Sequence, residues 1–245
     1  MKFLGLSFSE LSLKQTCDAL LTRPAGAAFA YVVTPNADHL ERLRRNPALR
    51  PAYESALLRL FDSRFLAHCA RALGQEAPPV VTGADLTAAL LPVLVGDRVA
   101  VVGMQDAAFA ALRARFPGIH FIHHNPPMGL LNQPEAFAGA VQFIARVQAR
   151  FVFFALGSPV QELLAQEVMR QGRAVGLGLC IGAAMEFAAG TRRRAPGWLR
   201  RAGLEWLHRL SQEPRRLGPR YLLRAPRVLV LLLAEAAGFR AGSNR

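Results

Sequence analysis

Short apolar runs alternate with amphipathic stretches along the first 190 residues. Runs that fit buried strands occur at residues 3–8, 28–33, 98–102, 119–123, 151–156 and 175–181. Stretches that fit helices lie between them, at residues 12–21, 37–45, 51–60, 106–116 and 134–149, with shorter ones ending near residues 73, 171 and 189. Strands that alternate with helices favour a parallel sheet, so we expect an α/β, Rossmann-like domain over residues 1–189 with helices on both faces of its sheet.

The pattern changes after residue 189. Apolar residues now recur at roughly helical spacing with arginines between them, at Trp198, Leu199, Trp206, Leu207 and Leu210. From residue 192 onward there are thirteen arginines and three glutamates, so this segment carries +10 of the formal net charge of +13. We expect residues 190–245 to form a basic, helical, amphipathic appendage, whose guanidinium groups suit phosphate recognition next to something apolar.

Composition indicates a folded protein of the cytoplasm. A hydrophobic fraction of 52% is ample for a core. The three cysteines are far apart in apolar surroundings, which favours reduced thiols, and polar residues break the apolar run near the N-terminus, which argues against a signal peptide. The apolar run at residues 228–234 is far shorter than the ~20 residues that span a bilayer. It could lie in a membrane interface beside the arginines, or it could pack on the core.

Several kinds of chemistry lack their motifs. The chain has no GxSxG, GxxxxGK, HExxH or GxGxxG sequence, and no two aspartates are spaced as D-x-D. His123 and His124 have no third ligand at useful spacing, so we interpret them as loop residues and expect no metal site. No cofactor is expected either. If the protein handles a nucleotide diphosphate, arginines and helix N-termini must do the work of a metal ion.

Polar residues follow the second predicted strand and the stretch at residues 51–60. Thr34 and Asn36 stand where open α/β sheets bind ligands, although both could be simple turn and cap residues. Asp62 precedes a helix and could be its N-cap, or it could be a carboxylate at a pocket rim that accepts a proton. The residues alone leave both alternatives open.

Taken together in order, these motifs resemble one family. They are TPNADHL at residues 34–40, Asp62, GADL at 83–86, GSP and QE within 157–162, Gly182, Gly190, RAPGW at 194–198, GLEWLHRL at 203–210, EP at 213–214 and RY at 220–221. From residue 5 to about residue 222 the chain resembles the WecG/TagA/CpsF glycosyltransferases.

This resemblance implies a membrane-associated, inverting, metal-independent transferase. Such an enzyme moves a hexose from a UDP-sugar to a saccharide on a polyprenyl diphosphate, in the synthesis of a cell-surface polysaccharide, at the inner face of the membrane. The hexose would be N-acetylmannosamine, its uronic acid or glucose, and a homo-oligomer is possible. By the same resemblance Asp62 would be the catalytic base and Gln161 would contact the nucleotide sugar. Thr34 and Asn36 would line the donor pocket, and the donor's diphosphate would bind Arg209, Arg216 and Arg220.

Two positions depart from the family's pattern. Val160 stands where the family usually has lysine, and Ser63 stands where it usually has the glycine after the base. The first change removes a charge at the pocket rim and bears on the preference for donor or acceptor. The second is expected to change the turn that aims Asp62, since serine is less free than glycine at positive φ. These departures leave one alternative open, an inactive scaffold of the same fold. A second alternative is a nucleic-acid-binding protein, since arginine with interleaved aromatic residues also suits phosphates and stacked bases. The apolar run at residues 228–233 and the lack of a recognisable nucleic-acid module argue against the second, so no nucleic-acid partner is expected.

Overall fold

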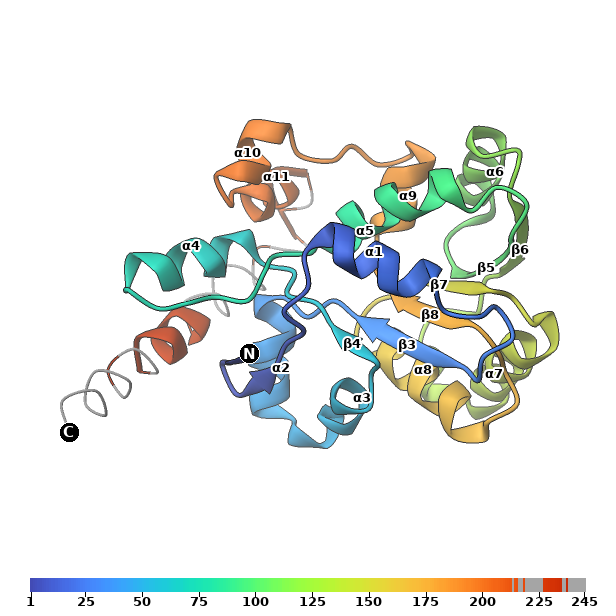
Figure 1. Cartoon of the computed structure of the whole chain (residues 1–245), viewed down its shortest axis with the longest axis horizontal. Helices are drawn as coiled ribbons and strands as arrows, with labels where there is room; N and C mark the ends of the chain where they lie inside the picture. Colours follow the sequence, from blue (N-terminus) through green and yellow to red (C-terminus); the bar gives the residue numbers. More distant parts are fainter. Residues whose placement is uncertain (213, 216–217, 219–226, 235–236, 238–245) are drawn as a thin grey trace.

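The computed structural model describes residues 1–212, 214–215, 218, 227–234 and 237. At its centre is a six-stranded sheet of order β4-β3-β8-β7-β5-β6, in which every neighbouring pair is parallel (Figure 1). Its strands are β3 (Ala30–Val33), β4 (Leu58–Arg59), β5 (Arg98–Gly103), β6 (His120–His124), β7 (Phe151–Ala155) and β8 (Leu177–Cys180). The α/β, Rossmann-like fold expected from the sequence is confirmed.

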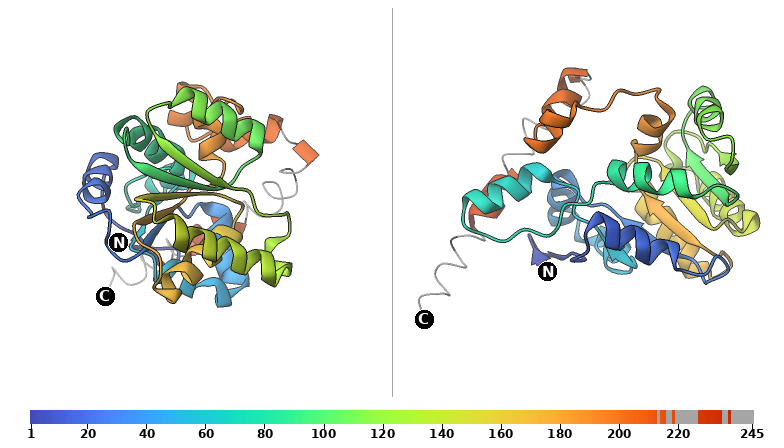
Figure 2. Two further views of the ribbon diagram at one scale, coloured as in Figure 1. Left: turned by 90° about the vertical axis from the view of Figure 1, so that its right-hand side faces the viewer. Right: turned by 45° about the horizontal axis from the view of Figure 1, so that its top comes forward.

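Helices cover both faces of the sheet (Figures 1 and 2). One face packs against α1 (Leu13–Leu21), α5 (Gly83–Leu90), α6 (Asp106–Arg115) and α9 (Ala184–Ala189). The other packs against α2 (Ala37–Arg45), α3 (Pro51–Glu54), α7 (Pro134–Val147) and α8 (Val160–Gln171). Consecutive residues of a central strand pack in different hydrophobic cores on the two faces of the sheet, as Phe153 and Phe154 do, because side chains alternate across a strand. In the part of the chain that the structure describes, three single 3₁₀ turns lie at Pro47–Leu49, Leu91–Val93 and Leu130–Asn132.

The strand expected at residues 3–8 is wrong. The segment is a tight antiparallel hairpin of β1 (Lys2–Phe3) and β2 (Leu6–Ser7). Leu4 and Gly5 between them both have positive φ, 46° and 77°, which reverses the chain within two residues. The continuous apolar pattern concealed this turn because Phe3, Leu6 and Phe8 are all buried in the same core.

The helix expected at residues 51–60 is also wrong beyond its first turn. Helix α3 ends at Glu54, and the chain then forms β4 at the edge of the sheet. Backbone pairing with β3 determines this, since Leu57 N–H donates to Tyr31 O and Leu60 N–H donates to Val33 O. The Arg59 guanidinium closes the turn by donating to the carbonyl oxygens of Tyr53, Glu54 and Ala56. Tertiary contacts therefore outweigh the local helical pattern.

The segment after α9 is helical and lies against α4 (Arg64–Ala72). Helix α9 ends at Gly190, and after an extended stretch come α10 (Gly197–Arg201) and α11 (Glu205–Gln212). The Trp206 ring packs edge-to-face on Phe65, and His68 Nε2 lies 2.9 Å from Arg201 O. Residues 227–234 are also helical. Among the described residues, no helix has the length and apolarity that crossing a membrane requires.

Candidate active site

A cavity of about 920 Å³ opens at the carboxyl edge of the sheet. Its floor is formed by the segments that leave β3, β7 and β8, including Thr34, Gly157 and Gly182. The chain leaves β3 towards α2 on one face and β8 towards α9 on the other. Because neighbouring strands lead to opposite faces here, a crevice forms between their ends, which is where open α/β sheets bind ligands.

Asp62 lies in this cavity and is not a helix cap. Ser63 caps α4, its Oγ accepting a hydrogen bond from Leu66 N–H. Asp62 itself is fixed from two sides: its N–H donates to Pro35 O at 3.0 Å, and its Oδ2 accepts from Gly83 N–H at 3.1 Å. Glycine suits position 83 because a side chain there would be crowded: its Cβ would lie 3.3 Å from Ile181 and from Thr34 Oγ1. The cap alternative for Asp62 is thereby excluded.

The position of Asp62 gives it an unusual ionisation. Burial is the main cause, and it raises the pKa of the carboxyl to about 6 from an ordinary 3.8. The positive charge of Arg209 and the Gly83 hydrogen bond oppose this rise, while the charges of Glu205 and Asp85 add to it. A carboxylate with this pKa is largely ionised at neutral pH and still basic enough to accept a proton.

Thr34 and Asn36 also lie at the cavity, with defined local roles. Thr34 Oγ1 donates to Cys180 O at 3.0 Å and so ties the end of β3 to the end of β8. Asn36 caps α2, its Oδ1 accepting from the N–H groups of Asp38 and His39. The prediction that Asn36 is a cap residue is therefore confirmed. The Asn36 amide nitrogen makes no hydrogen bond to the described residues.

Gln161 lines the cavity with its side chain locked in place. Its Oε1 accepts from Gly182 N–H at 3.0 Å, and its Nε2 donates to Glu162 Oε1 at 2.8 Å. Glu162 is buried, and burial raises its pKa. The sequence did not single out Glu162 as a support for Gln161, because a Gln-Glu pair at a helix start is ordinary chemistry.

Arg209 reaches the cavity from α11. Its guanidinium lies over the Phe187 ring at 5.3 Å and pairs with Glu205 at 3.2 Å. Its charge acts on Asp62, so the expected base and one expected diphosphate ligand share the cavity. Arg216 and Arg220, the other two expected ligands, lie outside the described residues.

Three further arginines line the cavity that sequence reasoning did not assign to the site, Arg64, Arg192 and Arg200. Arg192 pairs with Glu186 at 3.2 Å. Arg64 is in the first turn of α4 and pairs with Asp85 on α5, which Arg194 also pairs with at 2.8 Å. Burial alone would raise the pKa of Asp85, but its ion pairs with Arg194 and Arg64 lower it to about 2. Only the fold brings Arg64 and Arg200 together, so their spacing gave no signal.

The two family departures cause no local strain. Ser63 has φ −153° and ψ 91°, an extended conformation that any residue adopts, so glycine is not required after Asp62. Val160 is the first residue of α8 and packs on the core.

The paired histidines lie away from the cavity. Both are in β6 rather than in a loop, which corrects the sequence interpretation. The His123 ring stacks on Phe109 at 4.1 Å, and the His124 ring stacks on Phe143 at 5.0 Å. Across the described part of the chain, no three His, Cys, Asp or Glu side chains are grouped to hold a metal ion.

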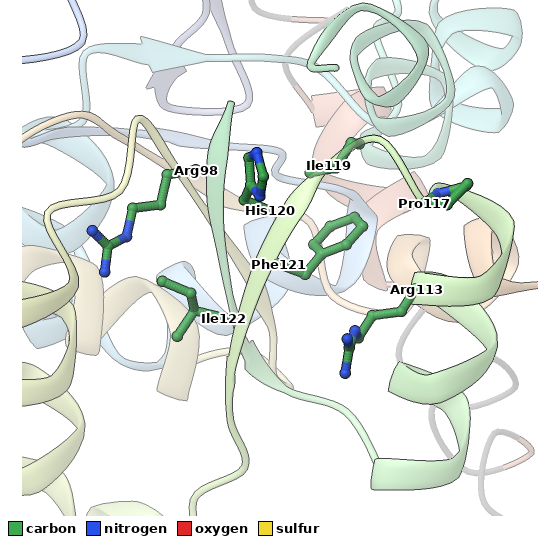
Figure 3. Close-up of a pocket in the computed structure, with 7 residues that line it drawn as sticks. All are labelled: Arg98, Arg113, Pro117, Ile119, His120, Phe121 and Ile122. Carbon is green, nitrogen blue, oxygen red and sulfur yellow. The ribbon is translucent and has the colours of Figure 1, made fainter. Parts of the chain in front are cut away.

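A second, smaller hollow lies at the opposite end of the sheet, around the start of β6 (Figure 3). Its volume is about 540 Å³, and Arg98, Arg113 and His120 supply its basic groups. Figure 3 shows Arg98 on one side of β6 and Arg113 on the other. The basic groups do not converge there, so the cavity around Asp62 is the better candidate for a reaction site.

Comparison with known proteins identifies a family for the chain. A family model described as the WecG/TagA/CpsF family of glycosyl transferases matches residues 1–242. Two similar curated proteins are N-acetylglucosaminyldiphosphoundecaprenol N-acetyl-beta-D-mannosaminyltransferases of Staphylococcus aureus, from strains MRSA252 and MW2. Each is 23% identical to this chain, over 225 and 223 residues, and each match covers 88% of this chain and 85% of the relative. Because the family model spans nearly the whole sequence, this chain belongs to the WecG/TagA/CpsF family of glycosyl transferases.

Proposed function

We propose that this protein is an inverting, metal-independent transferase that moves a hexose from a UDP-sugar to a saccharide on a polyprenyl diphosphate. The observation that carries the proposal is a partly buried carboxyl of raised pKa, Asp62, in one cavity with the guanidinium of Arg209. The names of the two Staphylococcus aureus relatives supply the acceptor class, a sugar on a polyprenyl diphosphate, and one candidate hexose, N-acetylmannosamine.

In the proposed step Asp62 is the general base. An acceptor hydroxyl attacks the anomeric carbon of the donor while the bond to the departing UDP breaks on the opposite face. The hydroxyl proton passes to the Asp62 carboxylate. Proton transfer of this kind typically contributes roughly 10²–10⁴-fold to a rate, and it is most effective when the pKa of the base is near the working pH.

Cationic side chains stabilise the leaving diphosphate in this proposal. Arg209 supplies one guanidinium, held over Phe187 and beside Glu205. The sequence resemblance assigns the same role to Arg216 and Arg220. A preorganised donor aimed at developing charge is worth about 3 kcal/mol in favourable cases, so a few guanidinium groups can replace a divalent ion.

The donor's nucleotide and sugar are assigned to the floor of the cavity. Thr34 and Asn36 line it at the end of β3, and the locked Gln161 lines it from α8. The amide nitrogen of Asn36 is the candidate donor of a hydrogen bond to the sugar, because the Asn36 oxygen already caps α2.

We further propose that residues 1–189 form the catalytic domain and residues 190–245 an appendage that completes the site at the inner face of the cytoplasmic membrane, in cell-surface polysaccharide synthesis. Arg209 supports the completion of the site, because it lines the cavity. Trp198 and Leu233 support membrane contact, because these apolar residues are 62% and 52% exposed. A homo-oligomer is compatible with this proposal, and analytical sedimentation of the purified chain would detect one.

The test is a transfer assay on the purified chain in excess EDTA. UDP-linked N-acetylmannosamine, its uronic acid and glucose are each offered with N-acetylglucosamine on a short polyprenyl diphosphate, and mass spectrometry identifies the product. We expect one donor to add a single hexose, with EDTA present. A folded protein that binds UDP but forms no product would support the inactive scaffold instead, and activity that needs added manganese or magnesium would contradict the role given to the arginines.

A further inference from the structure

The cavity is surrounded by an excess of guanidinium groups. In the described part of the chain, the arginines that line it are Arg64, Arg192, Arg200 and Arg209, and Arg192 pairs with Glu186. The other three, together with the neighbouring Arg194, are four arginines that pair with only two carboxylates, Asp85 and Glu205. The proposed function assigns only one of these four, Arg209, to the donor.

The four arginines form two groups. Three of them surround Asp85: Arg194 and Arg200 face its Oδ1, at 2.8 and 3.6 Å, and Arg64 bonds its Oδ2. The other group is centred on Glu205, which pairs with Arg209 at 3.2 Å. Arg194 bridges the two groups, since its Nε lies 3.6 Å from Glu205. The cavity therefore has two cationic regions, each built on a different carboxylate.

The Asp85 group keeps unused hydrogen-bond donors. A guanidinium carries five N–H groups, and one carboxylate cannot satisfy three guanidiniums. Arg200 Nε, like the Nε atoms of Arg194 and Arg209, is buried and has no hydrogen-bond partner among the described residues. Arg64 and Arg200 both line the cavity, with 27% and 33% of their side chains exposed. These two side chains can hold an anion with the paired hydrogen bonds that phosphate favours.

This second region adjoins the proposed base. Arg64 is two residues after Asp62, and Asp85 lies two residues after Gly83, whose N–H binds Asp62. An acceptor sugar whose hydroxyl meets Asp62 carries its own diphosphate at the far side of a single ring. In an inverting transfer that diphosphate is distinct from the leaving one, so the reaction needs two separate anion subsites.

On this basis, which rests on the proposed function, we propose that Arg64 and Arg200 bind the diphosphate of the lipid-linked acceptor. The donor's diphosphate is left to the region around Arg209. Asp85 acts as a positioning residue, since it holds both guanidinium groups at the wall of the cavity.

The test compares Arg200→Gln with Arg201→Gln in the full chain. Both substitutions remove one charge from α10, but Arg201 is exposed and does not line the cavity. We expect Arg200→Gln to raise the KM for the lipid-diphosphate acceptor tenfold or more, with the KM for the UDP-sugar within about twofold. Arg201→Gln should leave both values unchanged. Arg64→Gln should match Arg200→Gln, and Arg200→Lys should restore part of the loss.

A binding measurement separates this inference from the proposed function. Farnesyl diphosphate serves as a probe in titration calorimetry with the unmutated protein and with each variant. Weaker binding in Arg200→Gln and Arg64→Gln alone supports the subsite, even if no donor sugar is transferred. Equal binding in all variants overturns it. A raised KM for the UDP-sugar also overturns it, because the arginines would then hold the donor's diphosphate or an acidic donor sugar.

Discussion

At the scale of single residues, the ionisation of Asp62 links structure to reaction. Its carboxyl is partly removed from water, and its strongest stabilising contacts are one backbone N–H and the charge of Arg209. These contacts do not offset the effect of burial, so the pKa is about 6 rather than 3.8. A folded protein that holds a carboxylate under these conditions gives up stability for function.

The pH dependence of Asp62 follows from the direction of this shift. Because the base must be ionised, kcat should fall as the pH drops through about 6 and level off above about 7. A pH–rate profile between pH 5 and 8.5 measures this. A rate that stays flat down to pH 5 would contradict the raised pKa.

Stability should change in the opposite sense to activity. A folded pKa above the unfolded one means that the ionised form destabilises the fold, increasingly so from pH 4 to 6 and fully above. Asp62→Asn should therefore stabilise the protein at pH 8 by on the order of 1–2 kcal/mol, allowing for partial exposure, and raise Tm by a few degrees. At pH 4 the two proteins should melt at nearly the same temperature. Destabilisation at pH 8 would contradict the account.

The sequence predicted the residues that follow strands better than those that meet through space. Thr34 and Asn36 follow a predicted buried strand, whereas Asp62 and Gln161 were assigned their roles by the family resemblance; all four line the cavity. Arg64 and Arg200 meet at Asp85 only because α4, α5 and α10 converge. One arginine among many in a basic chain carries no signal before that convergence is known.

At the scale of elements, residues 227–234 present two different faces. Val228 and Leu232 are buried in the same core as residues of α4, with 1% and 0% of their side chains exposed, and Val228 also lines the cavity. Val230 and Leu233 are exposed. The two sequence alternatives for this run, core packing and membrane contact, therefore belong to opposite sides of one helix.

A matched pair of substitutions tests this division. Leu232→Ala removes a fully buried side chain and should cost about 2–3 kcal/mol of stability. Leu233→Ala should change stability by less than about 0.5 kcal/mol. It should nevertheless weaken sedimentation with anionic liposomes several-fold, because it removes apolar surface from the proposed membrane face. Thermal melts and liposome sedimentation of both variants provide the measurement, and equal destabilisation by the two would show that the faces are wrongly assigned.

Element boundaries show where sequence patterns fail. The predicted bounds of α1 and α2 agree closely with the structure because a side-chain cap and apolar periodicity coincide there. The predicted bounds of α6 and α8 also agree closely, although no side chain among the described residues caps either helix. The prediction of a helix over residues 51–60 was wrong because Pro51 and the helix-forming residues after it start a helix that ends at Glu54, where the chain turns to pair with the edge of β3. The hairpin at the N-terminus misled because its turn contains an apolar Leu4 at positive φ.

At the scale of the whole molecule, the described residues after Gly190 contact the rest of the chain through charge and packing. Arg194 pairs with Asp85, Trp206 packs on Phe65, and Val228 enters the core. The same segment brings Arg200 and Arg209 to a cavity whose base comes from the sheet. In the proposed mechanism the base therefore comes from one part of the chain and most of the cations come from the other.

The most direct test of this account is a comparison of turnover and UDP binding in the unmutated protein and in Asp62→Asn, both in excess EDTA. We expect kcat to fall by roughly two to four orders of magnitude, because proton transfer is lost. The Kd for UDP, from titration calorimetry, should remain within about threefold, because Arg209 and the floor of the cavity are intact. Near-normal turnover in a folded Asp62→Asn protein, or a loss explained by weaker UDP binding alone, would contradict the assignment of Asp62 as the base.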